Sequence, residues 1–148
     1  MILDCTLRDG GYYTNWNFDT QMVKDLVQAL DLSGVGVMEM GYKSPVKGGK
    51  YRKCNDRFIW DVLDYRKPVN LKLAFMIDAK DFIKGDEVDY ALIDDVIHNS
   101  EDSPFDICRL AIKYSELDHS VKIGDYVKTK GYDLIAVSYT HLRAHETS

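Results

Sequence analysis

The chain has 148 residues, of which 45% are hydrophobic and 29% are charged, and its formal net charge is −5. These values are typical of an ordinary globular domain, and the length is sufficient for one domain with a real core. The negative charge disfavours general binding to nucleic acid or anionic lipid, and no apolar run approaches the roughly 20 residues of a membrane span. We therefore predict neither a nucleic-acid partner nor membrane association.

The three cysteines are Cys5, Cys54 and Cys108. Their number is odd and no two of them are spaced as CxxC, so the sequence shows neither a disulfide framework nor a zinc motif. Free thiols are the usual state in a reducing compartment. We therefore expect a cytoplasmic protein.

The first stretch that could carry chemistry is residues 2–11, with the sequence ILDCTLRDGG. Its apolar opening predicts a buried strand, and Gly10 and Gly11 indicate a turn after it. Arg8 and Asp9 would then lie together at the end of that strand, where catalytic groups collect in α/β barrels. A surface ion pair that caps the strand is an equally good interpretation of these residues alone.

Beyond this stretch, predicted helices and strands alternate. Apolar residues at helical spacing predict helices over residues 19–33, 56–67, 89–99 and 115–130. Nearly continuous apolar runs predict buried strands over residues 35–41, 71–77, 106–112 and 132–137. This alternation indicates an α/β fold with a parallel sheet, which could curl toward a barrel or stay open as in flavodoxin-like proteins. The chain is shorter than the roughly 250 residues of an eight-stranded barrel.

Three charged residues lie in or next to the predicted strands. Glu39 falls inside an apolar run, where a lone carboxylate is costly unless it is paired. Arg109 lies inside another strand and needs a carboxylate, for which Glu39 and Asp78 are both reasonable partners. Asp78 ends its strand where a barrel site would be, although it could equally pair with Lys80 or cap the next helix.

Two loops have unusual compositions. The aromatic loop at residues 12–18 could form the wall of a substrate pocket or cover the mouth of a barrel. The loop at residues 42–55 is basic and contains Lys43, Lys47, Lys50, Arg52 and Lys53. We interpret the basic loop as a solvated segment, or else as one that closes over an anionic substrate.

The segment Thr6-Leu7-Arg8-Asp9-Gly10, after an apolar strand that contains Asp4, resembles the opening signature of the metal-dependent HMG-CoA lyase-like, or DRE-TIM, aldolase–lyase family. Residues 8–13 and 15–18 (RDGGYY and NWNF) look most like the 4-hydroxy-2-oxovalerate aldolase-like members. The resemblance implies a (β/α)8 TIM barrel. Residues 1–137 would be an incomplete barrel, with about the first four βα units plus a fifth strand. Residues 138–148 look instead like a translated sequencing adapter.

The resemblance also implies roles for individual residues. Asp9 would bind a divalent metal, Mn²⁺ or Mg²⁺ with Zn²⁺ also possible, and Arg8 would polarise a keto or enolate oxygen. Glu39 would be a catalytic residue beside the metal site, as a support for it or as a proton relay, or else a purely structural partner for a cation such as Arg8. Tyr12 stands where pyruvate-releasing aldolases have a histidine base, a departure from the aldolase pattern, and with Asp78 and Arg109 it is a candidate for substrate binding.

The implied function is divalent-metal-dependent carbon–carbon cleavage or condensation of a 2-keto acid such as pyruvate. The remaining metal ligands of the family, a His-x-His pair on a later strand, are absent here, so the fragment is expected to be inactive. The intact protein is expected as a homo-oligomer or paired with another enzyme. The alternative is a non-catalytic α/β barrel domain that binds a ligand and has lost the chemistry.

Overall fold

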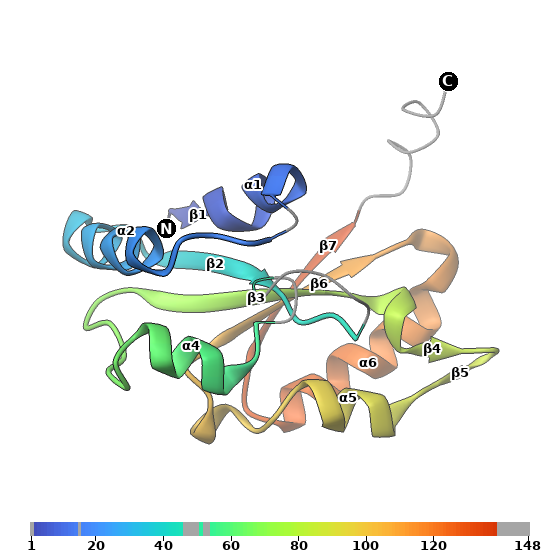
Figure 1. Ribbon diagram of the computed structural model, residues 1–148. Coiled ribbons are helices and arrows are strands. Elements are labelled where there is room, and N and C mark those ends of the chain that lie inside the picture. Colours follow the sequence, from blue (N-terminus) through green and yellow to red (C-terminus); the bar gives the residue numbers. More distant parts are fainter. Residues whose placement is uncertain (1, 15, 46–50, 52–53, 139–148) are drawn as a thin grey trace.

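The computed structural model describes residues 2–14, 16–45, 51 and 54–138. Its centre is a five-stranded sheet formed by β1 (Leu3–Asp4), β2 (Val37–Tyr42), β3 (Lys72–Asp78), β6 (Ile107–Ile112) and β7 (Asp133–Ser138) (Figure 1). The strands lie in the order β1-β2-β3-β6-β7, and every neighbouring pair is parallel. The predicted α/β fold with a parallel sheet is therefore confirmed.

The strand order decides between the two architectures that the sequence left open. A flavodoxin-like sheet reverses its winding direction, so its first strand lies between later ones. Here each strand of the sheet is a neighbour of the one before it in the chain, and winding never reverses. Right-handed crossovers in one direction place the helices on one side and let the sheet curl. The sheet is a curled, parallel half-barrel, similar to part of a TIM barrel.

The longer connections contain helices, whose bounds are α1 (Thr6–Thr14), α2 (Thr20–Ser33), α4 (Asp56–Val62), α5 (Tyr90–Val96) and α6 (Leu117–Thr129). Short 3-10 helices lie between other elements of the chain: η1 (Ala79–Phe82) after β3, η2 (Ser100–Asp102) before β6 and η3 (Tyr114–Glu116) after β6. Figure 1 shows α4, α5 and α6 together along one face of the sheet. A hairpin of β4 (Ile83–Lys84) and β5 (Glu87–Val88), which the sequence did not predict, projects after β3.

Helix α2 (Thr20–Ser33) confirms the helix predicted over residues 19–33, and capping residues fix both of its ends. The Asp19 side chain accepts a hydrogen bond from the backbone N–H of Met22 at 3.0 Å, as an N-cap residue does. Gly34 ends the helix with a φ of 86°, a left-handed conformation that favours glycine. Val23 and Val27 are buried, whereas Met22 is exposed.

The opening stretch differs from its prediction. Only Leu3 and Asp4 form the first strand, and the chain then turns into α1, which passes through Gly10 and Gly11 without the predicted turn. The Asp4 carboxylate starts this helix by accepting from the backbone N–H of Thr6 at 3.1 Å and from its hydroxyl at 3.0 Å. Short-range signals suggested a glycine turn, but packing of the helix against β2 overrides them.

Gly124 lies within α6, although glycine disfavours the interior of a helix. The helix is continuous there, and a Cβ atom on Gly124 would lie 2.8 Å from a methyl carbon of Leu134 on β7. The glycine therefore allows the helix to approach the sheet closely, and its helical cost is offset by packing.

The sheet has a different environment on each side. Its helix-covered side carries the main core, which includes Met38, Leu73, Phe75, Cys108 and Leu110. Its inner side carries a smaller apolar cluster of Val37, Ala74 and Ile107, with Leu3 and Ile135 packed against it. Side chains alternate between the faces of a strand, so residues two positions beyond this cluster also point inward.

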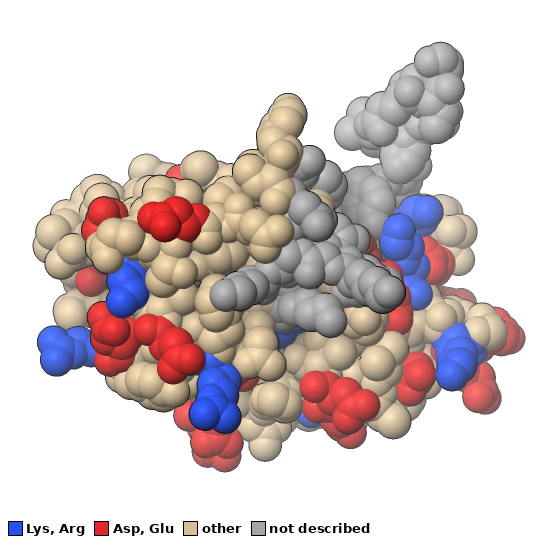
Figure 2. Space-filling view, viewed as in Figure 1, with Lys and Arg blue, Asp and Glu red and all other residues tan. Residues whose placement is uncertain are grey.

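The surface in Figure 2 carries mixed charges, with acidic side chains more numerous than basic ones. This agrees with the net charge of −5. Within the described part of the chain, none of the helices has both the length and the apolar character that crossing a membrane requires.

Candidate functional site

Three charged side chains from separate elements meet on the inner side of the sheet. Arg8 Nε lies 2.7 Å from Glu39 Oε1, and Arg109 Nη1 lies 2.8 Å from Glu39 Oε2. Glu39 is fully buried, while the two arginine side chains are 17% and 12% exposed. We call Arg8, Glu39 and Arg109 the inner network; its two cations face one carboxylate.

The register of the sheet explains why these residues meet. Glu39 is two residues beyond Val37 on β2, and Arg109 is two residues beyond Ile107 on β6, so both point to the inner side. Strand β3 lies between them, and its residue opposite Glu39 is Ala74. The β3 residue opposite Arg109 is Met76, two residues beyond Ala74, so the Arg109 side chain reaches Glu39 diagonally across β3. Arg8 comes from α1, which packs against β2.

Burial and charge have opposing effects in the inner network. Burial disfavours the charged form of Arg8, but its hydrogen bond and charge interaction with Glu39 outweigh burial and raise its pKa above the ordinary value. Arg8 therefore stays protonated at any working pH. For Cys5, whose Sγ lies 3.7 Å from Arg109 Nη1, burial and the negative charge of Glu39 raise the pKa, while the two arginines oppose the shift.

Asp9, the predicted metal ligand, lies at the edge of this network. Its Oδ1 atom is 2.6 Å from Arg8 Nη1, and its side chain is 64% exposed. Among the residues that the structure describes, no group of three or more His, Cys, Asp or Glu side chains could hold a metal ion. Asp9 could supply one ligand, but the described residues do not fit a complete metal site.

The predicted substrate-binding residues lie in different parts of the structure. Arg109 lies in the inner network. Its partner there is Glu39, one of the two carboxylates predicted as possible partners. Asp78 is the last residue of β3 and is half-buried, beside Ala111 of β6 in the sheet register. Tyr12 contributes its backbone to α1, but its side chain lies outside the described residues, so its predicted role is not tested.

Trp16 belongs to the site, although the sequence indicated it only as one ring of an aromatic loop. Its indole Nε1 donates a hydrogen bond to the backbone carbonyl of Arg8 at 3.0 Å. Its ring packs edge-on against Tyr42, the last residue of β2, with ring centroids 5.5 Å apart. The aromatic composition of residues 12–18 was the available signal, but it could not indicate which ring contacts Arg8.

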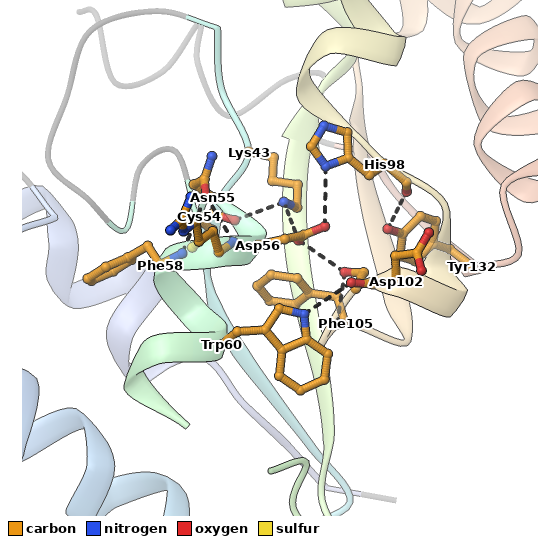
Figure 3. A network of polar contacts seen from close by, with 12 residues as sticks. Lys43, Cys54, Asn55, Asp56, Phe58, Trp60, His98, Asp102, Phe105 and Tyr132 are labelled. Atoms are coloured by element: carbon orange, nitrogen blue, oxygen red, sulfur yellow. Dashed lines mark hydrogen bonds and ion pairs between the residues drawn. The ribbon is translucent and has the colours of Figure 1, made fainter. Parts of the chain in front are cut away.

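A second buried ion network lies on the helix-covered side (Figure 3). Lys43 Nζ donates to Asp56 Oδ1 at 2.8 Å and to the Cys54 carbonyl at 2.8 Å, and it also lies over the rings of Phe75 and Phe105. The interpretation of residues 42–55 as a solvated basic loop is therefore wrong for Lys43, which is 1% exposed. Lys47, Lys50, Arg52 and Lys53 lie outside the described residues.

Asp56 is the centre of this second network. Its Oδ1 atom also accepts from the Ser103 hydroxyl at 3.0 Å, and His98 Nδ1 lies 3.7 Å from Oδ2. We call Lys43, Asp56 and Ser103 the outer network. Nearby, burial raises the pKa of Cys54 to about 12, and it raises the pKa of Cys108 as well. These thiols are protonated at neutral pH and unsuited to nucleophilic chemistry.

Comparisons with known proteins agree with the sequence resemblance. No family model matches the chain. Over 139 residues, the chain is 27% identical to 4-hydroxy-2-oxovalerate aldolase 3 of Rhodococcus jostii (strain RHA1) and 26% identical to the protein of the same name in Rhodococcus opacus (strain B4). Both matches cover 90% of this chain but only 38% of the relative.

A solved structure gives the same result for the fold. The crystal structure of the N-terminal domain of a candidate aldolase from Bacteroides vulgatus superposes with a TM-score of 0.77 at 25% sequence identity. The match covers 98% of this chain and 46% of that one. The resemblance first indicated by residues 6–10 is therefore confirmed: this chain is aldolase-like and spans less than half the length of the relatives it matches.

Proposed function

We propose that the intact protein is a carbon–carbon lyase or aldolase that acts on a 2-keto acid, as the names of its relatives suggest. The observation that carries this proposal is the inner network, in which two guanidinium groups share one buried carboxylate. Arg8 follows the C-terminal end of β1, the end of the strands at which barrel enzymes bind substrate, while Glu39 and Arg109 project from the middle of β2 and β6. In this proposal the half-barrel is part of a (β/α)8 TIM barrel, with four βα units and a fifth strand.

The inner network has capacity to bind an anion. A guanidinium carries five N–H donors, and Glu39 and Asp9 engage only part of those on Arg8 and Arg109. The remaining donors could bind the carboxylate and keto oxygens of a 2-keto acid, and their charge would stabilise the enolate that forms when the carbon–carbon bond breaks.

Glu39 is proposed to hold both arginines in place. A fully buried carboxylate with two short ion pairs has little freedom to approach a substrate, so orientation of Arg8 and Arg109 is better supported than proton transfer. Asp78 and Tyr12 stay candidates for substrate contact because both belong to elements at the same end of the sheet.

A divalent metal remains part of the proposal, with Asp9 as one ligand and the others outside the described residues. Mn²⁺ or Mg²⁺ would suit carboxylate ligation, and Zn²⁺ would become suitable if histidines complete the site. The metal would supply Lewis acidity toward the keto oxygen. Because the described residues do not complete such a site, we propose that the 148-residue chain binds substrate without turning it over.

The remaining proposals concern the setting of the protein. All three cysteines are free thiols in the structure, which supports a cytoplasmic location. The partner would be a small 2-keto acid, and the intact protein would form a homo-oligomer or pair with another enzyme, since a half-barrel leaves sheet edges to be covered.

Titration of pyruvate into the chain, followed by NMR, tests the anion site. We expect Arg8→Gln and Arg109→Gln each to weaken binding about tenfold or more, because each removes charge-assisted hydrogen bonds. Arg66→Gln, which removes an exposed arginine elsewhere, is the matched control and should not change the affinity. Equal affinity in all three variants would contradict the proposal.

Turnover is tested separately on a longer, full-length protein that contains this chain. Release of pyruvate from a 4-hydroxy-2-oxo acid in the presence of Mn²⁺, abolished by Asp9→Asn, would support the lyase. Pyruvate binding without turnover in that longer protein would favour the non-catalytic binding domain instead.

A further inference from the structure

We propose that Trp16 is the positioning residue that holds Arg8 against Glu39, an inference that rests on the proposed anion site. Trp16 bonds to the backbone carbonyl of Arg8, so its effect on a ligand bound at the Arg8 guanidinium would be indirect. Two further contacts support this role, and a matched tryptophan elsewhere in the chain allows a controlled test.

Trp16 folds back over the helix that it follows. Its φ of 56° is left-handed, and its backbone N–H donates to the Gly11 carbonyl at 3.0 Å. This conformation turns the indole toward α1, where Nε1 reaches the carbonyl of Arg8. A non-glycine residue rarely adopts a left-handed φ, and such strain persists only where surrounding contacts stabilise it.

The helix provides the space that the indole occupies. A Cβ atom built on Gly11 would overlap the Trp16 ring, so only glycine fits at that position. Gly10 differs, since a Cβ there would be 3.9 Å from the nearest Phe18 carbon, an ordinary contact. Gly11 and Trp16 therefore form a matched pair within one helical segment.

Trp16 also connects α1 to the strand that carries Glu39. Its ring contacts Tyr42, three residues beyond Glu39 on β2, and its carbonyl accepts a hydrogen bond from the Tyr51 N–H at 3.0 Å. Thus one side chain joins the backbone of Arg8 to the strand of its ion-pair partner.

This connection would stabilise the position of the short helix α1, which carries Arg8. Helix α1 has nine residues and follows a two-residue strand, and so short a helix is marginal without tertiary contacts. A displacement of about 1 Å would lengthen the 2.7 Å contact between Arg8 Nε and Glu39 beyond good hydrogen-bond geometry. Groups that bind substrate need this degree of support from their surroundings.

The experiment compares Trp16→Phe with Trp60→Phe. Trp60 Nε1 also donates to a backbone carbonyl at 3.0 Å, but that carbonyl belongs to Asp102 on the other side of the sheet. The two substitutions remove the same kind of bond, so a difference between them reports its location. The readout is the solvent-exchange rate of the Arg8 Nε–H proton, measured by NMR and assigned with Arg8→Lys.

We expect Trp16→Phe to accelerate this exchange about tenfold and to weaken pyruvate binding by a similar factor, as loss of one hydrogen bond would. Trp60→Phe should change neither. Unchanged exchange in Trp16→Phe would overturn the inference, and so would faster exchange with unaltered pyruvate affinity. If the wild-type chain binds no pyruvate, the proposed function fails, while the exchange comparison still decides whether Trp16 holds Arg8.

A second replacement guards against misfolding. In a Trp60→Phe background, the benzothiophene analogue of tryptophan can be incorporated at Trp16, which keeps the shape of the ring and removes its N–H donor. Faster Arg8 exchange in this folded protein supports the inference, and wild-type exchange overturns it.

Discussion

The two buried ion networks differ in charge balance and in access to solvent. The outer network joins one cation, Lys43, to one carboxylate, Asp56, and both side chains are less than 10% exposed. The inner network joins Arg8 and Arg109 to the buried Glu39, while the exposed Asp9 also pairs with Arg8, and both arginines keep partial contact with solvent. The networks lie on opposite sides of the same sheet.

This difference indicates different roles. A balanced and sealed ion pair has no surplus charge to offer a ligand, so the outer network is interpreted as a structural link between the end of β2, α4 and the segment before β6. In the inner network the second carboxylate, Asp9, is exposed to solvent, and the two arginines keep N–H donors and partial exposure that an anion can use. Burial alone would not distinguish the two networks, because each of them contains a buried carboxylate.

Lys43→Met should have the largest effect on stability. It would leave Asp56 buried without its cation, and we expect a loss of about 3–5 kcal/mol in the free energy of unfolding. Urea denaturation measures this loss. The double variant Lys43→Met/Asp56→Leu should recover much of it, and pyruvate affinity should stay unchanged in any folded form. A stable single variant would show that the outer network is not structural.

Glu39→Gln should destabilise the protein less, by about 2–4 kcal/mol, because Arg8 and Arg109 can partly rehydrate. Its distinctive property should be rescue by anions. Oxalate or sulfate should raise the melting temperature of this variant more than that of the wild type, because an anion can partly replace the missing charge. Lys43→Met, whose site is sealed, is the control. Equal responses in both variants would remove the proposed distinction between the networks.

Gly11→Ala should have the smallest effect of the three, about 1–3 kcal/mol, because its Cβ atom would displace the Trp16 ring. Gly10→Ala should instead be neutral or stabilising by up to about 1 kcal/mol, since alanine favours a helix and the space is open. Thermal or urea denaturation measures both changes. Stabilisation by both substitutions would show that the ring can move without cost.

Local patterns predicted much of this fold. The strands around Met38, Phe75 and Leu110 and the capped helix after Asp19 follow from apolar periodicity and from residues with strong conformational preferences. The sequence also indicated that Glu39 and Arg109 needed partners, because charges inside apolar runs are costly when unpaired. These predictions depend only on neighbours in the chain.

Contacts between distant residues decided the rest. Lys43 looked like part of a solvated basic loop, and its burial depends on Asp56 and on two aromatic rings contributed by other segments. Likewise, Gly10 and Gly11 suggested a turn but form part of a helix, because the Trp16 ring and β2 pack against it. Local preferences of about 1 kcal/mol are easily outweighed by such packing.

The sequence by itself determined that this is an α/β protein with a parallel sheet, and it identified the aldolase-like opening motif around Arg8 and Asp9. Only the tertiary structure decided the half-barrel strand order, the pairing of both arginines with Glu39, and the contact between Trp16 and Arg8. The physical reason is that periodicity reports which face of an element is buried, whereas the partner across that face depends on strand register and crossover direction.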